Sequence, residues 1–334
     1  MLFLNVFFKT LGLLIGITTF LILINLFFYY AFSENDDYSF KSGDIDSNNI
    51  IVTLSLNGPI INSPNQSFFG GLVNYIEPED VKKQLEKLKK LNVKILILKI
   101  NSPGGTVTAS SSLENIIKKF KLQSDTKIYF YTEEILTSGG YWVATAGDKI
   151  FANYGAIIGS IGVSGPSWYY YDNPTSISTS VLGQKIETEN GIQIFDQNSG
   201  NSKDLYNPFR KPTEKELNHL QNIVKEIYDD FILKFSKSRK IEINYIKNQI
   251  GALIYTGKQA KDNFLIDEVI GFDELLENIV VNENLENYKI LEYNFKNNFL
   301  NKYFESVFNL DNNFICKKIN ANFVSILPLF SNNC

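Results

Sequence analysis

The hydrophobic pattern of the chain opens with one long apolar stretch. Residues 10–32 (TLGLLIGITTFLILINLFFYYAF) carry no charged side chain. As a helix they would rise about 35 Å, which is enough to cross a hydrocarbon core of roughly 30 Å. We therefore predict a transmembrane anchor within residues 1–33 that contacts the lipid membrane through residues 10–32. A cleaved signal peptide is the alternative, which the length of the stretch and the lack of an A-x-A-like site disfavour.

Charges flank this stretch unequally. Lys9 precedes it, and Glu34, Asp36 and Asp37 follow it. This bias favours a single-pass protein of the plasma (inner) membrane, with its N-terminus in the cytoplasm and its remaining chain on the extracytoplasmic side. Residues 34–48 are polar and acidic, which is typical of a short linker that leaves the membrane.

Beyond the linker, apolar runs typical of buried parallel strands alternate with stretches of helical periodicity. This alternation predicts an α/β domain with a parallel sheet and right-handed crossovers. The expected strands lie at residues 50–56, 92–100, 127–131 and 149–152, and the expected helices at residues 78–91, 108–120, 139–147 and 213–238. The last helix is amphipathic, and the pattern places six side chains on its apolar side: Leu217, Leu220, Val224, Ile227, Phe231 and Phe235.

Composition excludes several classes of function. Hydrophobic residues make up 44% and charged residues 20% of the chain, and the net charge is −4, so no basic stripe for nucleic acid is present. Cys316 and Cys334 could form one disulfide, and no histidine or second cysteine cluster lies near them in sequence to complete a metal site. We expect no cofactor and no metal.

The chain has one histidine, His219, inside the helix expected at residues 213–238. Its place on the polar side of that helix favours a solvated surface histidine, which leaves no imidazole for a Ser-His-Asp triad. A serine nucleophile would then need a lysine as its base, a known variant in which a neutral amine accepts the hydroxyl proton.

The candidate nucleophile is Ser138, in the sequence TSGGY at residues 137–141. It stands between an expected strand and an expected helix, where partial positive charge and free N–H groups can stabilise an oxyanion. Gly139 and Gly140 remove side chains, so that a substrate carbonyl can approach the backbone. Taken alone, the sequence favours an ordinary serine N-cap with glycine turn residues.

A second glycine turn, NSPGG at residues 101–105, directly follows the strand expected at residues 92–100. Glycines at the carboxyl end of a parallel strand lie where open α/β sheets bind ligands, and their N–H groups could form the other half of an oxyanion hole. A plain Pro-Gly turn is the alternative. Because both glycine turns follow neighbouring strands of one predicted sheet, their coincidence favours a site.

The candidate base is Lys203, in GNSKD at residues 200–204. A base has to be neutral, and an ordinary lysine, with a pKa of about 10.4, becomes neutral near pH 7 only when it is buried away from carboxylates. The adjacent Asp204 opposes this unless its carboxylate points elsewhere. From local sequence alone, a solvated loop lysine is the favoured interpretation.

Three blocks of the chain resemble bacterial signal peptide peptidase A, in the same order. They are NSPGG at residues 101–105, TSGGYWVATAGDKIFANYGAIIGSIGV at residues 137–163 and GNSKDLYNPFRKPTEKE at residues 200–216. A further match joins IYTGKQA at residues 254–260 to Asp267. The order and spacing of the blocks carry the resemblance, which covers about residues 50 to 275.

The resemblance implies a crotonase-like (Clp protease-like) spiral of parallel strands and helices, in a catalytic domain at residues 49–285. It implies that Ser138 is the nucleophile, that Lys203 is the general base and that Ser160 orients the lysine amine. It also implies a homo-oligomeric ring, in which the lysine reaches the serine of a neighbouring subunit, and peptide substrates such as signal peptide remnants. The oxyanion hole would be formed by the backbone at Gly104, Gly105 and Gly139.

The chain departs from the family pattern at Thr137, where alanine is usual, at Ser202, where tyrosine usually precedes the lysine, and at residues 264–266. These departures concern the pocket shape and the substrate preference. None of them removes a catalytic group, so the implied reaction class is unchanged. Residues 286–334 match nothing and form an extension without an assigned role.

Two other functions remain as alternatives. One is a catalytically inactive membrane scaffold of the same fold, which the presence of both Ser138 and Lys203 disfavours. The other is a crotonase-type acyl-CoA enzyme, which the membrane anchor and the Ser-Lys blocks disfavour.

Overall fold

The computed structural model describes residues 2–31, 38–62, 74–172, 174–178, 185–187, 191–192 and 197–293. The chain divides into two compact units, one that ends at Ser39 and one that runs from Phe40 to Tyr293. Cys316, Cys334 and most of the extension at residues 286–334 lie outside the described residues.

The N-terminal unit contains one long helix, α1 (Leu2–Ala31). Its segment Leu4–Phe28 has a mean hydropathy of 2.4, and apolar side chains such as Leu13 and Phe20 are exposed. By length and composition, the helix can span a membrane, as the sequence predicts for residues 10–32.

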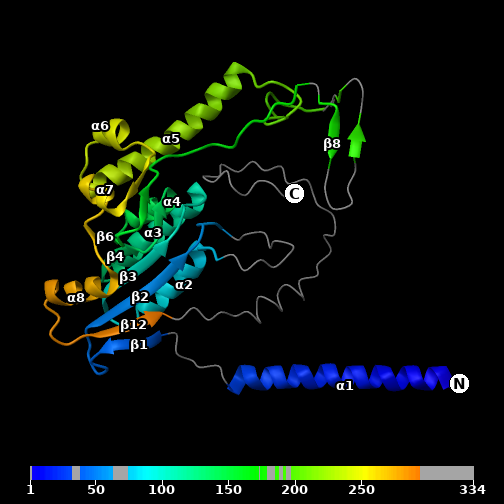
Figure 1. Ribbon diagram of the computed structural model, residues 1–334, viewed down its shortest axis with the longest axis horizontal. Helices are drawn as coiled ribbons and strands as arrows, with labels where there is room; N and C mark the ends of the chain where they lie inside the picture. Colours follow the sequence, from blue (N-terminus) through cyan, green and yellow to red (C-terminus); the bar gives the residue numbers. More distant parts are fainter. Residues whose placement is uncertain are drawn as a thin grey trace. The chain divides into compact units, whose positions relative to one another are not determined.

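A seven-stranded sheet forms the centre of the second unit, in the order β1-β12-β2-β3-β4-β6-β11 (Figure 1). Every pair from β12 to β11 is parallel, which confirms the expected α/β class. β2 and β3 are buried along most of their length, as strands with helices on both sides are. The strands of this sheet are β1 (Tyr38–Gly43), β2 (Ile50–Asn57), β3 (Val93–Asn101), β4 (Lys127–Thr132), β6 (Lys149–Ala152), β11 (Glu268–Val269) and β12 (Lys289–Tyr293).

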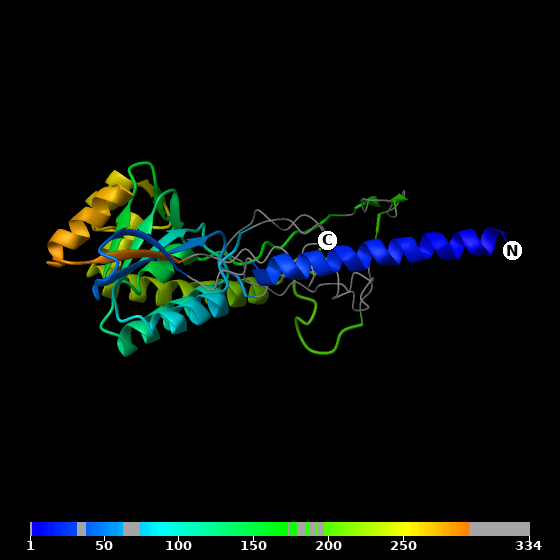
Figure 2. The ribbon, with the colours of Figure 1, turned by 90° about the horizontal axis from the view of Figure 1, so that it is seen from below.

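Helices cover both faces of the sheet: α8 lies on one face, and α2 and α3 lie on the other (Figure 2). The short α4 packs between α3 and α5, where Trp142 of α4 stacks on Phe231 of α5 with ring centroids 4.8 Å apart. The helices are α2 (Pro78–Leu88), α3 (Val107–Gln123), α4 (Gly139–Ala144), α5 (Glu214–Arg239), α6 (Ile243–Tyr245), α7 (Gly257–Asp262) and α8 (Phe272–Asn282), with a π-helical turn at Ile246–Ile250.

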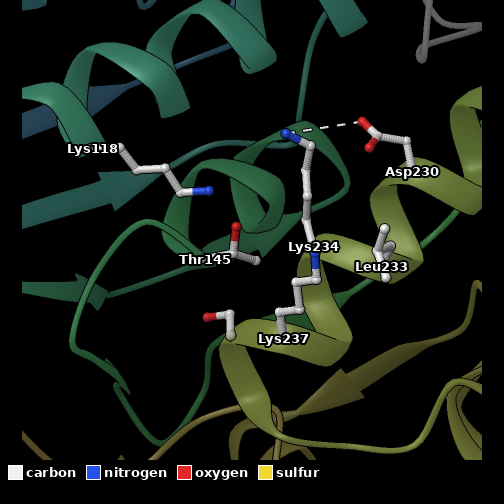
Figure 3. A pocket seen from close by; sticks show the side chains of 7 residues that line it. Lys118, Thr145, Asp230, Leu233, Lys234 and Lys237 are labelled. Carbon is white, nitrogen blue, oxygen red and sulfur yellow. Dashed lines mark ion pairs between the residues drawn. The ribbon is translucent and has the colours of Figure 1, made fainter.

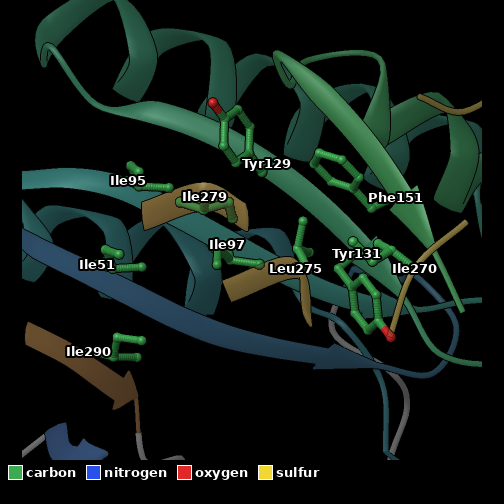
Figure 4. Packing of buried hydrophobic residues seen from close by; sticks show 10 residues of the cluster. All are labelled: Ile51, Ile95, Ile97, Tyr129, Tyr131, Phe151, Ile270, Leu275, Ile279 and Ile290. Carbon is green, nitrogen blue, oxygen red and sulfur yellow. The ribbon is translucent and has the colours of Figure 1, made fainter. Parts of the chain in front are cut away.

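A cluster of ten buried side chains fills the space between the sheet and α8 (Figure 4). The strands contribute alternate residues, because successive side chains of a strand point to opposite faces. The cluster consists of Ile51, Ile95, Ile97, Tyr129, Tyr131, Phe151, Ile270, Leu275, Ile279 and Ile290.

A second, three-stranded sheet positions the candidate nucleophile. β5 (Ile135–Thr137) pairs in parallel with β7 (Ile157–Gly159), and β7 pairs antiparallel with β10 (Ile254–Thr256). A separate antiparallel pair is formed by β8 (Ser176–Ser178) and β9 (Lys185–Glu187).

Burial changes along α5. Of the six side chains on its apolar side, only Phe231 and Phe235 are buried, because only the C-terminal half of the helix packs against α4. The N-terminal half extends past α4 (Figure 1). The other four side chains are exposed or only half-buried: Leu217, Leu220, Val224 and Ile227.

The large sheet also extends beyond the domain limits expected at residues 49 and 285. β1 lies in the segment expected to be a linker, and β12 lies in the expected extension. β1 (YSFKSG) is a mostly exposed strand at the edge of the sheet, so its sequence lacks the apolar run that marks β2 and β3.

Candidate active site

Ser138 occupies the sharp turn between β5 and α4. Its φ and ψ are 52° and −122°, a conformation that residues other than glycine rarely adopt. The residue is 3% exposed, and its hydroxyl oxygen is buried without a hydrogen-bond partner among the residues that the structure describes. Backbone strain and an unpartnered buried hydroxyl both cost stability, and both are typical of functional positions.

The NSPGG turn lies beside Ser138 because the chain leaving β3 pairs with β5. The backbone N–H of Ser102 donates to the carbonyl of Ile135 at 2.8 Å, and the N–H of Thr137 donates to the carbonyl of Ser102 at 3.1 Å. The structure thus brings together the two glycine turns that the sequence placed after neighbouring strands.

Two backbone N–H groups at this contact, those of Gly105 and Gly139, have no acceptor in the part of the chain that the structure describes. They are the donors expected of an oxyanion hole. The third predicted donor differs, because the N–H of Gly104 donates to the hydroxyl of Ser102 at 3.2 Å.

Gly104 matters to the site because it has no side chain. Its φ is 112°, and a Cβ there would lie 2.9 Å from the nitrogen of Gly139 and 3.2 Å from the hydroxyl oxygen of Ser138. A side chain at this position would therefore occupy the space between the nucleophile and a free N–H group.

Ser160 is also brought to the site. The parallel register pairs Thr137 with Gly159, and the N–H of Ser138 donates to the carbonyl of Gly159 at 2.9 Å. Ser138 and Ser160 therefore follow paired residues of adjacent strands. Ser160 has a φ of 51° and is half-buried, so it repeats the left-handed backbone of Ser138.

Lys203 makes no hydrogen bond to Ser138, because the hydroxyl of Ser138 has no partner among the described residues. The lysine is exposed, and its ammonium has no ion pair or hydrogen bond to the described residues. It lies in a tight turn in which Ser202 and Tyr206 have φ values of 61° and 65°. The turn precedes the N-terminal end of α5, which extends away from α4 (Figure 1).

Arg210 fixes the carboxylate next to Lys203. Its guanidinium donates to Asp204 from Nε at 2.6 Å and from Nη2 at 2.9 Å, and it also binds Glu216 at 2.8 and 2.9 Å. These hydrogen bonds lower the pKa of Asp204, and with those from Thr213 they lower the pKa of Glu216 well below its usual range. Asp204 thus points away from its neighbouring lysine, to Arg210.

Aromatic packing supports the same turn. The ring of Trp168 lies 5.3 Å from that of Tyr206 and 5.1 Å from the guanidinium carbon of Arg210, and its indole N–H donates to the carbonyl of Asn207 at 3.2 Å. The segment that follows β7 and Ser160 therefore packs, through Trp168, against the turn that carries Lys203.

A buried carboxylate anchors the helix that follows Ser138. Glu114 of α3 is fully buried, and it accepts hydrogen bonds from the indole of Trp142 in α4 and from Lys234 in α5, both at 2.9 Å, and from Lys118 at 2.5 Å. Burial raises its pKa, but these donors outweigh burial and the net pKa is lowered. Glu114 thereby ties three helices together behind the nucleophile.

A cavity of about 420 Å³ lies next to this ion cluster, between α3 and α5 (Figure 3). Thr145, which follows the last residue of α4, lines it, so the cavity is at the opposite end of α4 from Ser138. On the α5 side of the cavity, Lys234 pairs with Asp230, one turn earlier in the same helix, at 3.9 Å. The cavity is therefore separate from the contact between the two glycine turns.

The sequence did not reveal every residue that builds the site. The T-x-x-E spacing of Thr213 and Glu216 is a readable capping box, and the structure has it, but the bonds of Arg210 to two carboxylates depend on the folded turn. Glu114 lies on a predicted helix without any local sign of burial. The assembled groups, a free hydroxyl facing two free N–H groups, can perform acyl transfer once a base is supplied.

Comparisons with known proteins agree with this chemistry. A family model described as peptidase family S49 matches residues 120–286. An inferred signal peptide peptidase SppA of Enterococcus faecium is 30% identical over 261 residues, which cover 77% of this chain and 70% of that protein. An inferred protease of Methanocaldococcus jannaschii is 33% identical over 196 residues, and the match covers 59% of this chain and 58% of that protein, less than two thirds of its length.

Among solved structures, ClpP1 of Listeria monocytogenes aligns with a TM-score of 0.40 and 16% identity, over 67% of this chain and 94% of that one. At this score, the strand order described above defines the fold, and the alignment adds nothing to it.

Proposed function

The chain belongs to peptidase family S49, and from this premise we propose that it is a membrane-anchored serine endopeptidase with Ser138 as nucleophile and Lys203 as general base. One observation carries the proposal. The hydroxyl of Ser138 is buried and unpartnered on a strained turn, beside the free N–H groups of Gly105 and Gly139. This is the arrangement that an acyl-enzyme mechanism needs before a base arrives.

The base is the lysine of another copy of the chain. His219, the single histidine, is exposed on α5, and no group in the described part of the chain binds the hydroxyl of Ser138. Lys203 is exposed on a turn that Arg210 and Trp168 hold in place, and its ammonium is unpaired in the described part of the chain. An exposed lysine on a turn held in this way is suited to enter the site of a neighbouring subunit, in a ring closed by such contacts.

The reaction then follows in balanced steps. The oxygen of Ser138 attacks the scissile carbonyl carbon, its proton moves to the amine of Lys203, and the carbonyl electron pair moves to the oxygen, where the free N–H groups stabilise the charge. The C–N bond breaks as the lysine returns the proton to the leaving amine. Water then attacks the acyl-enzyme, gives a proton to the lysine and releases the acid, and Ser138 regains its proton.

Substrate and location follow from the anchor. α1 is long and apolar enough to hold the chain in the plasma membrane, and the acidic residues after it favour an extracytoplasmic catalytic domain. Hydrophobic peptides in or near the bilayer, such as signal peptide remnants, are the substrates such an enzyme would meet. The name of the enterococcal relative supports this substrate class.

The test compares the full-length protein in detergent micelles with two variants, Ser138→Ala and Lys203→Ala. We expect the wild type to cleave a panel of signal-peptide-like sequences and each variant to lose at least about 10³-fold in kcat, because removing either member disables the pair. Retained turnover in either variant would remove that residue from the mechanism. A wild type that cleaves nothing in the panel would favour the scaffold alternative.

A further inference from the structure

A second buried hydroxyl near the nucleophile is left without a partner. Ser110 lies in the first turn of α3 and is fully buried, and its Oγ makes no hydrogen bond to any part of the chain that the structure describes. A serine in a helix can satisfy its hydroxyl by bonding to the carbonyl four residues earlier. The carbonyl of Thr106 accepts only the backbone N–H of Ser110, at 3.0 Å, so this ordinary solution is not used.

The unpartnered hydroxyl faces the turn after Ser138. A Cβ built on Gly139 would overlap the Oγ of Ser110, and it would lie 3.1 Å from the nitrogen of Gly105. Ser110 Oγ and the free N–H of Gly105 therefore border the same small space beside Gly139. Because the nitrogen of Gly139 is bonded to the Cα on which that Cβ is built, the backbone nitrogens of both Gly105 and Gly139 lie beside this space.

The energetic cost of this hydroxyl points to a missing ligand. Burying a hydroxyl without a hydrogen bond is unfavourable, and an alanine of similar size would avoid the cost. The other such hydroxyl at this site belongs to Ser138, whose partners are supplied by the base and the substrate. A ligand oxygen held by Gly105 and Gly139 would lie within reach of Ser110 as well.

We propose that Ser110 is a catalytic residue whose hydroxyl is the third donor of the oxyanion hole. It stays unpartnered until a substrate carbonyl oxygen enters and then donates a hydrogen bond to the negative charge that forms there. This inference rests on the proposed peptidase function and adds to it a side-chain donor that no sequence motif marked.

The experiment uses the full-length protein in detergent micelles and a hydrophobic peptide substrate that the wild type cleaves. Ser110→Ala is compared with Ser112→Ala, an exposed serine of the same helix. We expect Ser110→Ala to lower kcat/KM by about 10²-fold. We expect a similar loss in the binding affinity of a peptide aldehyde, because this inhibitor forms a hemiacetal oxyanion on Ser138. Its Tm should equal or exceed that of the wild type, because the variant loses a buried unpartnered hydroxyl.

A third variant separates hydrogen bonding from packing. Ser110→Cys fills the same position with a weak donor, so we expect it to remain as slow as Ser110→Ala. Wild-type activity in either variant, or a loss of activity that follows a loss of Tm with no change in aldehyde affinity, would overturn the role of Ser110. If the wild type and Ser112→Ala both cleave nothing in the peptide panel, so that no such substrate is found, the proposed function is overturned, and this inference with it.

Discussion

Arg210 binds Asp204 through two hydrogen bonds, at 2.6 and 2.9 Å, and so engages the carboxylate that follows Lys203 in sequence. This lowers the pKa of Asp204 and keeps the carboxylate ionised but directed at the guanidinium. A lysine that has to act as a neutral base benefits, because a free carboxylate beside it would favour its protonated form.

Removing Arg210 should therefore move the pH dependence of catalysis. In Arg210→Ala, Asp204 loses its partner and adds negative charge near the lysine, which favours the ammonium form. The acidic limb of the kcat/KM profile, where activity rises as the base loses its proton, should shift to higher pH. Lys211→Ala removes a neighbouring positive charge without touching Asp204, so an equal shift in that control would contradict a specific effect of the Arg210–Asp204 pair.

Gly104→Ala should abolish catalysis. The new methyl group would lie 2.9 Å from the nitrogen of Gly139 and 3.2 Å from the hydroxyl oxygen of Ser138, at a φ of 112° that disfavours alanine. We expect kcat to fall by at least about 10²-fold, measured as peptide turnover. Gly155→Ala, where a Cβ meets no atom within 4 Å, is the matched control and should stay active. Full activity in Gly104→Ala would show that this space is not used by the substrate.

Glu114→Gln should destabilise the protein because it weakens the hydrogen bonds that join Trp142, Lys118 and Lys234. We expect a loss of about 1–3 kcal/mol in the free energy of unfolding by urea at pH 7. Lys118→Met removes a half-exposed partner of the same carboxylate and should cost less, about 1 kcal/mol or below.

The same substitution gives a pH signature. The pKa of Glu114 is lowered on folding, because its three donors outweigh burial. Its contribution to the free energy of unfolding is therefore present above the unfolded pKa of about 4.3 and is lost as the pH falls below that value. The stability difference between wild type and Glu114→Gln should therefore shrink below about pH 4. A difference that grows on acidification would contradict this assignment.

Sharing of the site between subunits predicts complementation. Ser138→Ala and Lys203→Ala should each be inactive, and assemblies reconstituted from an equal mixture should regain up to about a quarter of wild-type activity, because a working pair needs an intact serine facing an intact lysine. A mixture that stays inactive, although cross-linking shows mixed assemblies, would place both residues within one chain.

Much of the fold could be read from the sequence. The strands β2, β3, β4 and β6 match the expected ones to within about one residue, because their apolar runs are long and strands buried on both faces have a plain signature. The three-residue strands β5, β7 and β10 are too short for any period to appear. Yet β5 and β7 set the register that places Ser138 beside Gly159.

The site was only partly predictable for a similar reason. Ser138 and the glycine turns lie in local motifs, so their meeting followed from the expected order of the strands. The roles of Glu114 and Ser110 depend on contacts between segments far apart in sequence: Trp142 and Lys234 donate to Glu114, and Ser110 faces Gly139. The role of Gly104 depends on its backbone conformation in the folded turn, where its N–H donates to the hydroxyl of Ser102. The half-exposed face of α5 shows the same limit, because an apolar stripe does not say whether its partner belongs to the same chain.

The central claim is that Ser138 is the nucleophile and that Lys203 activates it. The most direct measurement is the rate at which a fluorophosphonate labels the full-length protein in detergent micelles, with the modified residue located by mass spectrometry. The account predicts label on Ser138 in the wild type, none in Ser138→Ala, and labelling at least about 10²-fold slower in Lys203→Ala. Label on another residue, or an unchanged rate in Lys203→Ala, would contradict it.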